Sequence, residues 1–80
     1  MNNIPERVTQ CFSNVFPNLR KNEISGASMA SLAGWDSVAH VTLLSSVAEE
    51  FGLDLEVEDF EELVSYPLIV EYVEKKSPDA

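Results

Sequence analysis

The chain has few basic residues, and they all lie near its two ends. Its 80 residues include five Lys or Arg and 14 Asp or Glu, which gives a net charge of -9. No Lys or Arg occurs between Asn22 and Glu74. Such a surface repels nucleic acids and anionic lipids, and it attracts proteins that carry basic patches. The charge therefore argues against nucleic acid as a partner and favours proteins with basic docking surfaces.

Cysteine and long hydrophobic runs are also scarce. A single cysteine, Cys11, excludes an intrachain disulfide and favours a reducing, cytoplasmic setting. The N-terminus lacks the charged-then-apolar pattern of a signal peptide, and no apolar run approaches the roughly 20 residues that span a bilayer. One cysteine, one histidine and no EF-hand spacing indicate no metal site. We expect a cytoplasmic monomer without a membrane span, in which Cys11 is a small buried hydrophobe.

Hydrophobic spacing predicts helices. Hydrophobic residues make up 45% of the chain, which is typical of a folded domain. We expect one domain over residues 1–76 and a disordered tail over 77–80. A first helix is predicted over 3–16, because Pro5 suits its first turn and Pro17 stops it. Its inward face consists of Ile4, Val8, Cys11, Phe12 and Val15.

A long connection is predicted after this helix, over about 18–35. Ile24, Leu32 and Trp35 should anchor it to the core. A loop of this length is unusual in a small domain unless it serves a purpose or holds a short helix.

Two further main helices and one short helix are expected in the rest of the chain. The second helix should run over 36–51, with Gly52 in the left-handed conformation after it. A short third helix is predicted over about 58–63, and a fourth follows Ser65 as its N-cap. The fold is therefore predicted to be all-α, a small bundle of three main helices plus one short helix, with a long loop between the first and second helices. The inward residues are expected to be Val41, Leu44, Val47 (or Ala48), Phe51, Phe60, Leu63, Ile69, Val70 and Val73.

The start of the second helix holds the most informative motif, Gly34-Trp35-Asp36-Ser37-Val38. Asp36 is a strong N-cap residue, because its carboxylate can accept hydrogen bonds from free backbone N–H groups. Ser37 then falls in the first turn, with its hydroxyl directed to solvent. Free amides and the helix dipole favour negative charge at this position. The motif therefore suits the attachment of a group through a phosphate.

A glycine, then Asp-Ser-Val at a helix start, resembles the attachment motif of the acyl carrier protein family. The resemblance continues from about residue 32 to about residue 73, through Glu49-Glu50-Phe51-Gly52 and the Tyr72-Val73 ending. It implies that Ser37, flanked by Asp36 and Val38, bears a 4'-phosphopantetheine arm derived from coenzyme A. A phosphopantetheinyl transferase would install the arm, whose thiol carries acyl intermediates as thioesters between separate enzymes. It implies no catalytic activity of the chain's own.

The resemblance also implies a partner surface, which we place at Val38, His40, Val41, Glu49 and Glu50. We expect His40 to be a surface histidine beside the attachment site, and Trp35 to be partly buried with one edge near the arm. Carriers of primary fatty-acid synthesis tend to be more acidic along the second helix. Here Ala39, Thr42 and Ala48 stand at such positions, and Ser45 replaces a large apolar residue. Specialised, polyketide-like biosynthesis is therefore favoured over housekeeping fatty-acid synthesis.

Three alternatives remain open. A peptidyl or aminoacyl carrier is the nearest one, although such domains usually show Gly-Gly-His/Asp-Ser. An unmodified acidic helical adaptor that binds a basic partner is the second. A small hydrolase using Ser37 and His40 is the third, but the sequence offers no nucleophile elbow and no third group to orient the histidine.

Overall fold

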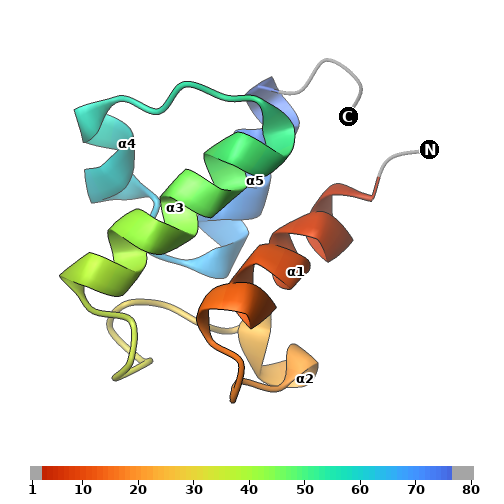
Figure 1. The fold of residues 1–80 in the computed structure, drawn as a ribbon, viewed down its shortest axis with the longest axis vertical. Coiled ribbons are helices and arrows are strands. Elements are labelled where there is room, and N and C mark those ends of the chain that lie inside the picture. Colours follow the sequence, from red (N-terminus) through yellow and green to blue (C-terminus); the bar gives the residue numbers. More distant parts are fainter. Residues whose placement is uncertain (1–2, 77–80) are drawn as a thin grey trace.

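The computed structural model describes residues 3–76, which form helices and no strand. The all-α prediction is confirmed, and the expected tail over 77–80 lies outside the described residues. Figure 1 shows α1 and α3 side by side, with α5 behind them and α4 at the side of α3. The described helices are α1 (Ile4–Val15), α2 (Lys21–Ile24), α3 (Ser37–Phe51), α4 (Val57–Glu62) and α5 (Tyr66–Lys76).

Helix α1 lies within one residue of the predicted bounds at each end, and it has the predicted inward face, of which Val15 is only partly buried. Pro5 lies in its first turn, where a missing N–H costs nothing, and the helix ends before Pro17. Ile4, Val8, Cys11 and Phe12 are buried. The burial of Cys11 confirms that this side chain is part of the core, and it raises the pKa of the thiol.

The long connection between α1 and α3 is anchored as expected, and it also holds the one-turn helix α2. Ile24 and Trp35 are buried, and Leu32 packs against the core from a partly buried position. Two backbone hydrogen bonds tie the connection to the region around the start of α5. The Met29 N–H donates to the Val64 carbonyl, and the Tyr66 N–H donates to the Ala27 carbonyl, both at 3.0 Å. The connection is therefore a fixed part of the fold.

Helix α3 is bounded by the two residues that the sequence indicates. The Asp36 carboxylate accepts a hydrogen bond of 2.9 Å from the Ala39 N–H, and Gly52 has a φ of 66°. The prediction that Val41 faces inward is wrong, because 52% of its surface is exposed. A helix turns about 100° per residue, so turning His40 and Leu44 inward places Val41 outside. The buried residues of α3 are His40, Leu43, Leu44 and Val47.

Helix α4 is the least buried of the described helices. It contains no fully buried residue, although the expected inward residue Phe60 packs partly against the core and Leu63, just after α4, is buried. Two polar contacts hold it. The Phe60 carbonyl lies 2.6 Å from His40 Nε2, and the Tyr72 hydroxyl donates to Asp59 Oδ2 at 2.9 Å. Burial and the bond to Asp59 raise the pKa of Tyr72 to about 12.

Aromatic rings and one arginine join α1 to the other elements. Phe12 makes T-shaped contacts with Trp35 and Tyr66, at 5.3 and 5.4 Å between centroids. Arg7 forms an ion pair of 2.7 Å with Glu50, bonds to the Glu50 carbonyl and lies 4.4 Å over the Phe51 ring. A cation beside the last carbonyls of α3 suits the helix dipole. Helix α1 therefore fixes both ends of α3.

We predict that Gly52→Ala lowers the free energy of unfolding by about 1 kcal/mol, because an L side chain is strained at positive φ. Chemical denaturation measures the change. The matched control is Gly26→Ala, since neither site crowds an added Cβ and only Gly52 has a positive φ. The control should be neutral or slightly stabilising. Equal effects at both glycines would contradict a conformational origin.

Candidate functional site at the start of α3

Ser37 is the first residue of α3, and its side chain is exposed. Among the residues that the structure describes, its hydroxyl has no hydrogen-bond partner. The Asp36 carbonyl accepts the His40 N–H at 2.8 Å, and the Asp36 carboxylate takes the Ala39 N–H. The first N–H groups of a helix have no partner within it, so those of Ser37 and Val38 stay available for a phosphate.

Trp35 and His40 form a buried support under this helix start. Only 2% of Trp35 and 6% of His40 are exposed. Trp35 Nε1 donates to His40 Nδ1 at 2.9 Å, and His40 Nε2 lies 2.6 Å from the Phe60 carbonyl oxygen. The indole is only a donor and the carbonyl only an acceptor. The imidazole must therefore be neutral, with its hydrogen on Nε2.

This arrangement corrects two predictions. His40 is not a surface histidine, and Trp35 is not partly buried. The reason is a hydrophobic staple, in which the residue before the N-cap packs against the fourth helical residue. Trp35 and His40 occupy these two positions around Asp36, and their rings lie 5.7 Å apart. The sequence signal for the pair was the N-cap itself, since it fixes which two residues form the staple.

The burial of His40 also removes the Ser-His hydrolase alternative. Both ring nitrogens already have partners, so the imidazole has no free lone pair with which to accept the Ser37 proton. The start of α3 thus presents a hydroxyl without a base of its own.

The outward face of α3 carries exposed valines next to Ser37. Val38 is 76% exposed and Val41 is 52% exposed, and their spacing places them on neighbouring positions of one face. The first charged side chain along α3 is Glu49, about 18 Å from Ser37 at 1.5 Å per residue. Glu49 is exposed, whereas Glu50 is paired with Arg7. The structure therefore brings Val38 and Val41 to Ser37, and it separates both glutamates from it.

The described part of the chain holds neither a cluster of metal ligands nor a membrane-spanning helix. Residues 3–76 contain no group of three His, Cys, Asp or Glu that could hold a metal ion. None of the helices formed by these residues is both long and apolar enough to cross a membrane.

Comparison with known proteins identifies the family. No model of a protein family matches the chain. A stretch of 54 residues, 68% of this chain, is 37% identical to an acyl carrier protein of Desulforapulum autotrophicum and covers 70% of that protein. The helical fold agrees with this similarity. The chain belongs to the acyl carrier protein family, whose members are non-catalytic carriers.

Proposed function

We propose that Ser37 carries a 4'-phosphopantetheine arm and that the terminal thiol of the arm holds acyl groups as thioesters. The observation that supports this most is the exposed, unpartnered Ser37 hydroxyl at a helix start fixed by a buried staple. The cap and the staple hold the backbone of Ser37 in one place. The side chain is nevertheless free to meet an enzyme.

The start of α3 suits the phosphate that would join the arm to the protein. Transfer from coenzyme A would form a bond between Ser37 Oγ and the pantetheine phosphate and release the nucleotide part of coenzyme A. The unpaired N–H groups and the helix dipole stabilise the negative charge of the resulting phosphodiester. Because His40 cannot act as a base, a phosphopantetheinyl transferase must remove the Ser37 proton.

We place the partner surface on the outward face of α3, with Val38 and Val41 as its apolar contacts. His40 supports this face from below and does not touch the partner. Glu49 acts by attracting basic docking patches, an effect on the association rate rather than on a close contact. Thr42 and Ser45, both exposed, keep the face neutral as far as Glu49. This surface favours enzymes of a specialised, polyketide-like pathway.

We predict that coenzyme A, Mg²⁺ and a phosphopantetheinyl transferase add one phosphopantetheine group to the wild-type chain and none to Ser37→Ala. Intact-mass measurement detects the addition. The matched control is Ser45→Ala, because Ser45 is an exposed serine of the same helix. The control should be modified like the wild type. Modification of Ser37→Ala, or its loss in Ser45→Ala alone, would refute the assignment.

We further predict that Val38→Asp lowers kcat/KM for this modification by roughly tenfold or more, at any salt concentration. Burying one valine stabilises a complex by about 1.5–3 kcal/mol, less the cost of ordering, and 1.4 kcal/mol corresponds to tenfold. Val57→Asp is the control, because Val57 is 74% exposed and begins α4. It should leave the rate unchanged.

Charge should behave differently from this apolar contact. Glu49→Lys should slow modification at low salt by a few-fold, and the effect should fade as salt rises. Glu50 is unsuitable for this test, since its reversal also breaks the ion pair with Arg7. A Val38→Asp variant that is modified as fast as the wild type would place the docking surface elsewhere.

A further inference from the structure

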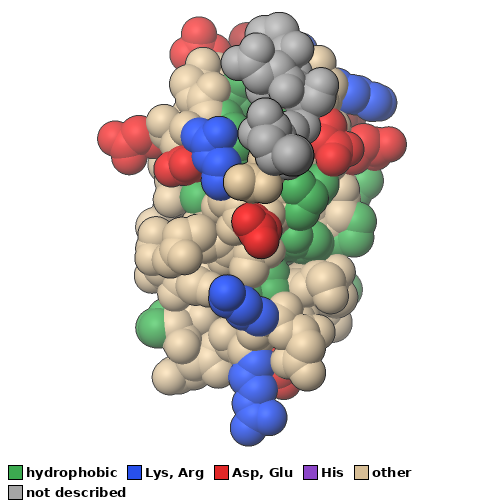
Figure 2. Space-filling model, turned by 90° about the vertical axis from the view of Figure 1, so that its right-hand side faces the viewer, with side chains coloured by type: hydrophobic (Ala, Val, Ile, Leu, Met, Phe, Trp, Pro, Cys, Tyr) green, Lys and Arg blue, Asp and Glu red, His purple; other side chains and the backbone are tan. Residues whose placement is uncertain are grey.

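A second surface with a defined chemistry lies between the start of α1, the end of α2 and α5. It is a groove of about 490 Å³, and none of its lining residues comes from α3. Figure 2 shows hydrophobic side chains gathered on the right of this side of the molecule, below a group of acidic side chains. The apolar lining consists of Pro5, Tyr66, Pro67, Leu68 and Val70.

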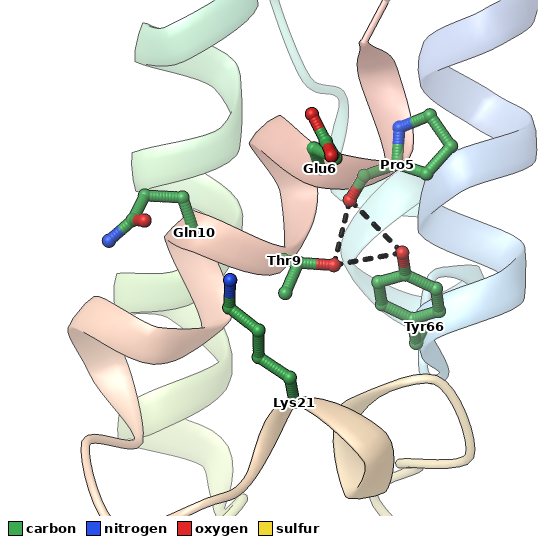
Figure 3. Close-up of a pocket in the computed structure, with 6 residues that line it drawn as sticks. All are labelled: Pro5, Glu6, Thr9, Gln10, Lys21 and Tyr66. Carbon is green, nitrogen blue, oxygen red and sulfur yellow. Dashed lines mark hydrogen bonds between the residues drawn. The ribbon is translucent and has the colours of Figure 1, made fainter.

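Hydrogen bonds fix the wall of this groove. Figure 3 shows the neighbouring pocket, which shares Pro5 and Tyr66 with this groove. In it, Thr9 and Tyr66 converge on the Pro5 carbonyl, to which their hydroxyls donate at 2.8 and 3.0 Å. The two hydroxyl oxygens lie 3.0 Å apart. The Tyr66 ring also contacts Phe12 in the core. Because Pro5 and Tyr66 are held in this way, the groove is a preformed surface. A partner that binds it therefore pays little conformational entropy to order these side chains.

The charge on the groove has one sign. Glu71 and Glu74 line it, and no Lys or Arg does. Both lie on the outward face of α5, one turn apart, beside the apolar residues Pro67 and Val70. Leu68, 41% exposed, forms the ridge between this groove and a hollow of about 150 Å³. An apolar floor beside two carboxylates is complementary to an apolar side chain that stands between basic ones.

We propose that this groove docks a basic segment of a partner protein, with one apolar side chain seated against Leu68 and Val70 and flanking Arg or Lys residues against Glu71 and Glu74. The groove shares no lining residue with α3, so a partner bound here leaves Ser37 accessible. One protein can then hold the carrier while another acts on Ser37. The inference does not depend on the modification of Ser37.

The test uses two short synthetic peptides at physiological salt, one with a leucine between arginines and one with serine in place of the leucine. Amide chemical shifts followed by NMR should change along 66–74, and the leucine peptide should bind more tightly. Leu68→Ser should abolish the difference between the peptides. Glu71→Lys combined with Glu74→Lys should weaken binding roughly tenfold, a change of about 1.4 kcal/mol.

The control for net charge is Glu49→Lys combined with Asp54→Lys, which reverses two exposed carboxylates outside the groove. This variant should bind the leucine peptide within about twofold of the wild type, because neither carboxylate lines the groove and salt screens exposed charges that make no direct contact. The leucine peptide, added at a saturating concentration, should also leave the rate of Ser37 modification unchanged. Shifts concentrated on α3 and α4, an equal loss in both double variants, or no preference for leucine would overturn the proposal.

Discussion

The hydrogen bond from Trp35 to His40 is the constraint on which the site depends. It lies between the residue before the N-cap and the fourth residue of α3, so it fixes where the helix begins. Both groups are buried, and an unsatisfied buried polar group costs about 1–3 kcal/mol. The indole N–H and both imidazole nitrogens have hydrogen-bond partners. Because the contact between Trp35 and His40 holds the start of α3, the Ser37 side chain can be exposed while its backbone stays in one place.

The same imidazole connects two parts of the fold. Its Nδ1 accepts from the loop before α3, and its Nε2 reaches the Phe60 carbonyl of α4. Helix α4 has no fully buried residue, and this bond and the contact between Tyr72 and Asp59 add to the partial packing of Phe60 against the core. The placement of α4 and the start of α3 therefore depend on one side chain.

Local chemistry explains what the sequence predicts correctly. Asp36, Gly52 and Pro17 each act on the backbone within a few residues, so their effects are visible in the chain itself. The exposed Ser37 follows from the Asp36 cap. The family follows from the motif and from the similarity to a known carrier. The assignment of phosphopantetheine to Ser37 remains a prediction.

Long-range contacts explain what the sequence does not predict. Hydrophobicity places Val41 inward and His40 outward, but the indole and a carbonyl 20 residues away make the imidazole a better core residue. Helix α2 has only four residues, which is too short for a hydrophobic period. Its start is stabilised by Glu23, whose carboxylate accepts the Arg20 N–H at 2.9 Å. This contact depends on the conformation of the whole connection.

Hydrogen exchange in Trp35→Phe tests the central claim most directly, because the substitution keeps a ring and removes the Nε1–H donor. The free energy of unfolding should fall by about 1–3 kcal/mol, since His40 Nδ1 is left without a partner. Under native conditions the Ala39 and His40 amides should exchange faster relative to the Val47 amide in the middle of α3. A uniform change along α3, or no change at Ala39 and His40, would contradict the claim that this contact fixes the start of the helix.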